Sequence, residues 1–514
     1  MTNLKIYTAL LFLLFIMPAC SDLLEEDALT FYSEDTVFST ESGAASAING
    51  VYASLSDWNC YGSAFHNLIM PVSGKFFSTQ RAALDATGLN TTPSNNSLTQ
   101  MWEGFYQVIN NANTVIKNVE TSDLATRETL LGEAHFLRGL TYLNLVRMFG
   151  GVPLRTKPTT LENIHQGRAS RQAVIDVVIA DLEKAKELLP ETPELGKPAK
   201  WAANVLLAKL YMTLAGEDGG KASFWASAKN ELEPVINSGV YQLTPTYAEL
   251  FEPGNENTRE SIFEMQYDHT GGGRNSDIVR IYTPSKSIYT PDGTETFGRM
   301  RPNKETFDAH FNQYPEDPRL ETTFIYGRYE KKTGGFQKVY PEKTNGNQGF
   351  ALIRKWLDPA YNGTTTTRNY ILLRYADVLL MMAEIENEIN GPDAAYQYVN
   401  QVLTRARDMD GDGAANTEQP ADFADMTQDE FRTRILKERQ YELLSEGHVW
   451  FDTRRRGYDY FLNEVVQPHN DHPEFDPTTD FTYPTSEKNM LLPIPLTEIS
   501  GNQMISVADQ NPGY

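Results

Sequence analysis

The sequence predicts a mainly α-helical protein, in which a tetratricopeptide-like scaffold of helical hairpins carries an irregular, loop-rich lobe. Three observations lead to this prediction. Long segments repeat apolar residues at helical spacing, and short breaks containing Gly and Pro separate neighbouring segments. Residues 58–100 and 240–370 instead combine Gly, Pro, Asn, Thr and aromatic residues with few periodic runs. Because loops this long are usually functional in a compact protein, the lobe is the expected functional part.

The helices expected in the N-terminal half share an amphipathic pattern and a clear stop signal. The first ends at Gly150-Gly151, and the second ends at Pro190. The third is apolar nearly all round, so it is expected to be buried. These helices are expected over residues 131–149, 173–189, 199–215 and 222–237.

Three more helices are expected in the C-terminal half. Residues 370–389 and 394–407 form a pair joined by a turn of Asn, Gly and Pro. Thr427, followed three residues later by Glu430, forms a capping box for a helix that runs to about residue 444. No fixed repeat period is visible, so the tetratricopeptide-like scaffold is predicted from the pairing of adjacent helices.

The composition excludes several classes of protein. At ~100–200 residues per domain, 514 residues allow about three domains or one large fold with two lobes. The net charge of −23 opposes binding to nucleic acid, which depends on neutralising phosphates, and to an anionic membrane surface. An apolar content of 40% rules out general disorder, and two cysteines rule out a disulfide scaffold.

The first residues are typical of a bacterial lipoprotein. Residues 9–17 form an apolar run too short to span a bilayer, as in a secretory signal. Cys20 follows a small residue, as in a lipobox, where the thiol is diacylated and the cysteine becomes the new N-terminus. We therefore expect a signal peptide over residues 1–19, and a lipidated Cys20 with an acidic tether over residues 20–40. The alternative is an ordinary cleaved signal that contains a cysteine.

Several short motifs follow one another along the chain in a recognisable order. They are EAHFLRG at 133–139, LVRMFGGVPL at 145–154, DPRL at 317–320, NYILLRYADVLLMMAE at 369–384, ERQYEL at 438–443, LPIP at 492–495 and QNPGY at 510–514. In this order, behind a lipobox, they resemble the SusD/RagB family of outer-membrane nutrient-binding lipoproteins. His135 and Gly139 replace residues that are more often Arg and Ala in that family.

This resemblance implies a function and a domain organisation. It implies a SusD-like helical region over residues 41–240 and a C-terminal RagB/SusD region over residues 241–514, which holds the loop-rich insertions. Such proteins capture oligosaccharides, or in some members peptides, at the cell surface. They deliver them to a SusC-like TonB-dependent transporter and have no catalytic activity. The resemblance places the protein in the outer membrane, anchored by lipid and exposed at the cell surface.

Aromatic side chains in the loop-rich stretches are the candidate ligand contacts. The C–H faces of a sugar stack on aromatic rings, while its hydroxyls need polar partners. The alternative is that many of these rings belong to the core. The candidates are Trp58, Tyr61, Phe65, Phe76, Phe77, Arg81, Arg274, Asn275, Tyr282, Tyr289 and Phe297.

A short acidic loop is the candidate metal site. Asp408, Asp410 and Asp412 alternate before a turn glycine, as in the first half of an EF-hand loop. The twelfth position holds Gln419 where that motif needs Glu. We therefore expect no required cofactor, with a structural Ca²⁺ at these three aspartates as a possibility. The alternative is an acidic turn without an ion.

The charged helix near the C-terminus raises the question of catalysis. Glu438, Glu442 and Glu446 recur every four residues and therefore share one face of the expected helix. Like charges at this spacing repel one another unless cations are paired with them. Arg374 and residues 454–456 are available for that role. A structural ion network is favoured over the acid and base of a glycosidase. No HExxH, GxSxG or phosphate-binding loop is present. The helical periodicity argues against a third interpretation, a structural lipoprotein of the fimbrial type, because such proteins are usually rich in β-strands.

Overall fold

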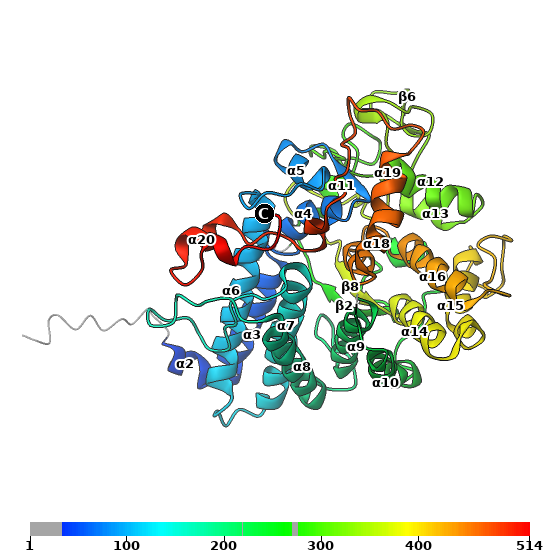
Figure 1. Cartoon of the computed structure of the whole chain (residues 1–514). Helices are drawn as coiled ribbons and strands as arrows, with labels where there is room; N and C mark the ends of the chain where they lie inside the picture. Colours follow the sequence, from blue (N-terminus) through cyan, green and yellow to red (C-terminus); the bar gives the residue numbers. More distant parts are fainter. Residues whose placement is uncertain (1–32, 218, 270–275) are drawn as a thin grey trace, which may run out of the picture.

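The computed structural model describes residues 33–217, 219–269 and 276–514. The predicted signal peptide, Cys20 and most of the acidic tether lie outside these residues. The described chain is mainly helical, with short strands and long loops (Figure 1). The predicted fold class is therefore confirmed. Among the described helices, none is long and apolar enough to cross a membrane.

The scaffold is a continuous series of packed helices. The N-terminal members are α2 (Glu34–Phe38), α3 (Glu41–Ser56), α6 (Asn96–Val119) and α7 (Arg127–Phe149). The series continues through α8 (Arg171–Leu188), α9 (Lys200–Gly216), α10 (Ser223–Asn237), α14 (Tyr375–Asn390), α15 (Pro392–Arg407) and α16 (Gln428–Leu443). Each packs against its neighbours, and α10 meets α14 although more than a hundred residues separate them (Figure 1).

Local sequence explains where these helices begin and how closely they pack. Thr427 and Glu430 form both hydrogen bonds of the predicted capping box. Gly139 lies where α7 crosses α8, and a Cβ there would come within 2.9 Å of the Leu182 side chain. The helices expected over 131–149, 173–189, 199–215, 222–237, 394–407 and 427–444 are confirmed.

Two expectations about local structure were wrong. Residues 370–389 are not one helix, because Tyr370–Arg374 form strand β8 before α14 begins. This strand pairs with β2 (Ser261–Met265) and is buried along its whole length, and such apolar runs read alike as strand or helix. The stretch 58–100 contains the wholly buried helix α4 (Ala64–Val72), and α6 has no counterpart among the expected helices.

The lobe is built from short elements, most of which lie between α10 and α14 in the chain, while α5 and β1 precede α6. Its helices are α5 (Leu84–Thr87), α11 (Ile278–Tyr282), α12 (Lys304–Gln313) and α13 (Arg319–Thr323). Three antiparallel pairs join β1 (Phe76–Ser78) to β3 (Met300–Pro302), β4 (Phe324–Ile325) to β7 (Leu352–Ile353), and β5 (Arg328–Glu330) to β6 (Phe336–Lys338). The C-terminal segment adds α17 (Val449–Arg454), α18 (Gly457–Phe461), α19 (Gln467–Asn470) and α20 (Leu496–Gly501).

Scaffold and lobe share one hydrophobic core. The main cluster of buried apolar residues includes Trp102 of α6, Trp356 of the lobe and Trp450 of α17. A shared core makes the two regions one cooperative body. The lobe can therefore present loops at the surface while its base is held by the helices.

Candidate functional site

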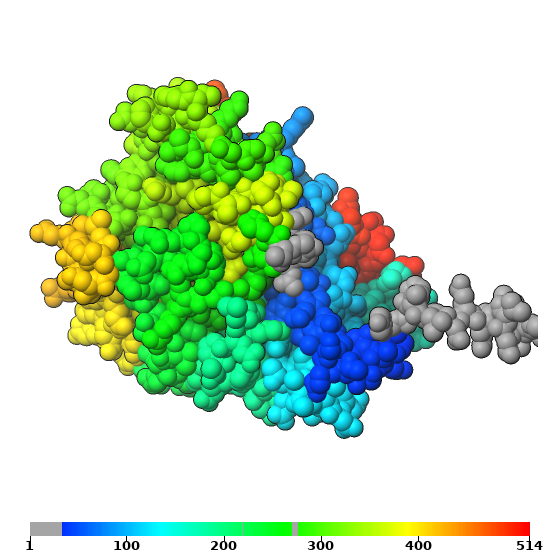
Figure 2. All heavy atoms as spheres, turned by 180° about the vertical axis from the view of Figure 1, so that it is seen from behind, coloured from blue at the N-terminus to red at the C-terminus, as the bar shows by residue number. Residues whose placement is uncertain are grey.

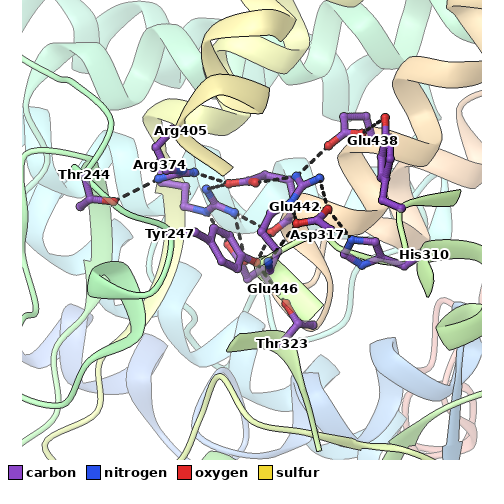
Figure 3. Close-up of polar contacts among 12 residues, drawn as sticks. Thr244, Tyr247, His310, Asp317, Thr323, Arg374, Arg405, Glu438, Glu442 and Glu446 are labelled. Atoms are coloured by element: carbon purple, nitrogen blue, oxygen red, sulfur yellow. Dashed lines mark hydrogen bonds and ion pairs between the residues drawn. The ribbon is translucent and has the colours of Figure 1, made fainter. Parts of the chain in front are cut away.

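The glutamate face of α16 forms the centre of a buried charge network. Three guanidinium groups surround Glu442, from Arg405 (2.5 Å), Arg374 (2.7 Å) and Arg319 (3.0 Å) (Figure 3). All four side chains are buried. Burial alone would raise the pKa of the Glu442 carboxyl, but the three arginines outweigh it and hold that pKa well below its ordinary value. Glu442 is therefore ionised at neutral pH.

The flanking glutamates are paired in the same way. Glu446 binds Arg374 (2.7 Å) and Lys355 (2.8 Å), and Glu438 binds Arg319 (2.7 Å). Further members complete the network. They are Glu260, which bridges Arg374 and Arg405, Asp317, which pairs with Arg319 and His310, and Thr244, which accepts a hydrogen bond from Arg405. The network ties α16 to α13, α15, β8 and the segment before β2 (Figure 3).

This arrangement supports the structural interpretation of the glutamate face. The general acid of a glycosidase must carry a proton and contact the sugar, whereas these carboxylates are buried and form ion pairs with arginine and lysine side chains. One detail of the expectation was wrong, because residues 454–456 do not join the network. Arg455 pairs with Glu384 and Asp452, and Arg454 donates to backbone carbonyls of Val72 and Ser73.

Five of the candidate aromatic rings lie in the core. They are Tyr61, Phe65, Phe76, Phe77 and Tyr282, each at most 8% exposed. Tyr61 stacks on Tyr370, and its hydroxyl accepts a hydrogen bond from Asn144 (2.7 Å). These rings support the loops from below and offer no face to a ligand in this conformation.

The remaining candidates stand at or near the surface. Trp58 is 37% exposed and Arg81 is exposed, while Tyr289 and Phe297 are half-buried. Tyr289 packs beside a small apolar cluster under the β5–β6 hairpin. Arg274 and Asn275 lie outside the described residues.

Backbone contacts join α11 to the loop that follows Trp58 and to the segment of Phe297, and we name the surface defined by Trp58, Arg280 and Phe297 the α11 face. The backbone N–H of Asp277, at the start of α11, donates to Gly62 in the loop that follows Trp58 (2.7 Å). The backbone N–H of Phe297 donates to the Arg280 carbonyl (2.8 Å), and the Arg280 guanidinium lies 4.4 Å from the Phe297 ring. A cation and an aromatic ring thus lie together, and α11 is joined by a backbone hydrogen bond to the loop that follows the exposed indole.

Two arginines of this region were not foreseen. Arg299 pairs with the buried Asp277 (2.6 Å), while Arg280 is farther from that carboxylate (4.0 Å) and partly exposed. Burial raises the pKa of Asp277, and the two arginines offset this only in part. Arg280 interrupts an otherwise apolar pentapeptide, and that interruption was the one available signal.

The predicted aspartate triad is assembled as a group. Asp408, Asp410 and Asp412 each offer an oxygen, and these oxygens lie within 4.8 Å of one another. Asp408 accepts hydrogen bonds from the backbone N–H groups of Gly411 (2.7 Å) and Gly413 (2.8 Å), which shape the loop. Oxygen ligands at this spacing could hold a hard cation such as Ca²⁺.

The described chain is thus a scaffold of paired helices that carries a lobe of long loops and short strands. A family model described as the SusD family matches residues 259–514, and one described as starch-binding and associating with the outer membrane matches residues 25–212. The chain belongs to the SusD/RagB family, whose members are non-catalytic binding proteins. The resemblance stated from the motifs is confirmed.

Individual relatives match over their full length. The chain is 27% identical to SusD-like protein P25 of Formosa agariphila, covering 100% of this chain and 99% of that protein. A SusD homologue from Bacteroides thetaiotaomicron superimposes with a TM-score of 0.78 at 22% identity, covering 94% and 98% of the two chains. A laminarin-binding SusD-like protein gives a TM-score of 0.69 at 22% identity, covering 92% and 100%. These structural matches show the shared fold.

Proposed function

We propose that this protein captures oligosaccharides at the cell surface, binds them at the α11 face and delivers them to a SusC-like TonB-dependent transporter. Membership of a binding family supports the capture step. A solved relative is described as laminarin-binding, and another structure of this fold contains a xylogluco-oligosaccharide. Lipidation of Cys20 would tether the protein to the outer membrane, with the acidic residues 20–40 as the spacer.

The exposed indole of Trp58 is the observation that carries the proposal. An indole offers a large, flat apolar face with a polar N–H at its edge, and this combination suits stacking on the C–H face of a sugar. The Arg280 guanidinium, held over Phe297, supplies donors for sugar hydroxyls. Arg81, Arg274, Asn275, Tyr289 and Phe297 remain candidate contacts, whereas the buried rings hold the loops in place.

Calorimetric titration of residues 22–514 tests the proposal. The panel consists of laminarin, xyloglucan oligosaccharides, starch oligosaccharides and mixed peptides, and release of reducing ends is assayed in the same samples. We expect weak, rapidly reversible binding to at least one glycan without cleavage. Binding to peptides alone would favour the RagB-like peptide alternative. Cleavage of a bound glycan would contradict the assignment as a binding protein.

We also propose that Asp408, Asp410 and Asp412 hold a structural Ca²⁺. The convergence of their oxygens supports this, and Gln419 in place of the usual Glu predicts weak affinity.

A further inference from the structure

The β5–β6 hairpin is a basic surface on an acidic protein. Residues 328–343 contain five cations, Arg328, Lys331, Lys332, Lys338 and Lys343, and two carboxylates, whereas the whole chain carries a net charge of −23. The hairpin forms the projection at the top of the molecule (yellow-green in Figure 2). Lys332 pairs with the exposed Asp292, and the remaining excess of positive charge on such a chain attracts anions to this surface.

The strand register concentrates this charge on one face. Arg328 pairs directly with Lys338, and both are exposed, while Tyr329 and Gln337 between the exposed positions are half-buried. Like charges directly opposite each other destabilise a hairpin. Lys338 has a loose, exposed contact with Glu342 (3.4 Å), and among the described residues no carboxylate lies within ion-pair distance of Arg328. An anion between the two cations would relieve their repulsion.

An exposed aromatic ring lies beside these cations. Phe336 is 60% exposed, and the Arg328 guanidinium lies 5.0 Å from its ring. Phe336 is also the direct partner of Glu330 across the hairpin. The face therefore offers a surface on which a sugar ring can stack, next to donors that bind oxyanions.

We propose that the hairpin face, defined by Arg328, Glu330, Phe336 and Lys338, binds anionic glycans. The carboxylate of a uronic acid or the sulfate ester of a sulfated sugar lies between Arg328 and Lys338, with the sugar ring on Phe336. The site is separate from the α11 face and selects among captured glycans by charge. The inference rests on the proposed function, because its ligand is the captured glycan. An anionic membrane is a poorer partner, since the rest of the chain is repelled from it.

The test compares glycans of different charge on the same variants. Wild-type protein and R328Q/K338Q are titrated at low and high NaCl with oligogalacturonate, a sulfated oligosaccharide and neutral laminarin. We expect the double variant to bind the anionic glycans about 3- to 10-fold more weakly, because it loses two exposed charge contacts. Laminarin affinity should not change. The two anionic glycans show whether carboxylate or sulfate is preferred.

Matched variants separate a binding role from a change in folding or net charge. K117Q/K184Q removes two exposed lysines from α6 and α8, and should leave every affinity unchanged. Glu330→Gln removes the carboxylate opposite Phe336 and should tighten binding of anionic glycans, which damage to folding cannot do. Phe336→Ala should weaken binding about tenfold through lost stacking area.

Two results would overturn the inference while leaving the proposed function in place. The first is laminarin binding with no difference between wild type and R328Q/K338Q on anionic glycans. The second is hairpin-dependent binding to phosphatidylglycerol vesicles without binding to anionic glycans. Failure of the protein to bind any glycan, neutral or anionic, would instead refute the proposed function.

Discussion

Two arginines on strands of this molecule have opposite surroundings. Arg374 on β8 is fully buried and contacts Glu260, Glu442 and Glu446. Arg328 on β5 is exposed and faces another cation across the hairpin. Burial forces a charge to be paired, because an isolated ion in the interior costs several kcal/mol, whereas water tolerates an unpaired charge. The buried charges of this network are held in ion pairs, whereas no ion pair of Arg328 is found among the described residues.

The largest effect is expected from breaking the buried network. Glu442→Gln leaves Arg319, Arg374 and Arg405 without their common anion, and should lower the free energy of unfolding by about 3–5 kcal/mol. Denaturant unfolding measures this loss. The exposed Glu418→Gln serves as the control and should stay within about 0.5 kcal/mol of wild type. A loss equal to that of the control would show that the network does not stabilise the fold.

The second effect is a loss of stability in acid. Burial lowers the pKa of His448 to about 4, well below its ordinary value of ~6.5. As the pH falls, His448 is protonated in the unfolded chain at a higher pH than in the folded protein. The neutral, buried His448 therefore stabilises the fold fully above pH ~6.5, and this stabilisation is lost as the pH falls towards 4. His448→Gln should therefore remove about 3 kcal/mol of the difference in stability between pH 7 and pH 4.

Urea unfolding at pH 7, 5.5 and 4 measures that difference. His66, whose pKa burial lowers to about 3, remains in both proteins and provides a common background. Depressed carboxyl pKa values, such as that of Glu442, add a further loss only below pH ~4.5. Parallel pH profiles for wild type and His448→Gln would contradict the prediction.

The third prediction is a loss of ligand affinity with little change in the stability of the fold. Trp58→Ala should weaken neutral glycan binding about tenfold, through the loss of one stacking face, and change the free energy of unfolding by less than about 1 kcal/mol. Calorimetry and denaturant unfolding of the same preparation measure both quantities. Leu161→Ala, at a highly exposed leucine, is the control. Unchanged affinity for glycans would remove Trp58 from the site.

The smallest effect is expected from calcium. Millimolar Ca²⁺ should raise the melting temperature by about 1–3 °C, because a weak ligand adds little more than 1 kcal/mol to stability. Differential scanning calorimetry measures the shift. Asp412→Asn should remove it, whereas Asp422→Asn, outside the triad, should not. A Ca²⁺ shift that persists in Asp412→Asn would place the ion elsewhere.

Patterns formed by residues close together in the sequence predicted most of the scaffold helices. The capping box at Thr427 and Glu430 formed as expected, because both partners lie within one helical turn. The spacing of Glu438, Glu442 and Glu446 indicated one charged face. The same spacing did not show that Arg319 and Arg405 would reach it, because both arrive from distant segments.

Long-range packing explains the remaining differences. The apolar run at 370–374 became a strand because β2 offered a partner more than a hundred residues earlier. Trp58, Tyr61 and Phe65 lie in the same loop-rich stretch of sequence, yet Tyr61 and Phe65 are buried and Trp58 is not. Local sequence carries no information about which of these rings other elements will cover.

Helix positions, their caps, the lipoprotein signature and the family motifs follow from residues that are neighbours in the chain. Each depends on spacing within a few helical turns, so the amino-acid sequence was sufficient to predict the helical class and the family. The exposure of Trp58 and the isolation of Arg328 depend on which other segments pack over them, and Arg374 pairs with carboxylates that lie 68 to 114 positions away in the chain. These features were decided by the packing of the shared core, because burial determines whether a charged group or an aromatic ring stabilises the fold or is accessible to a ligand.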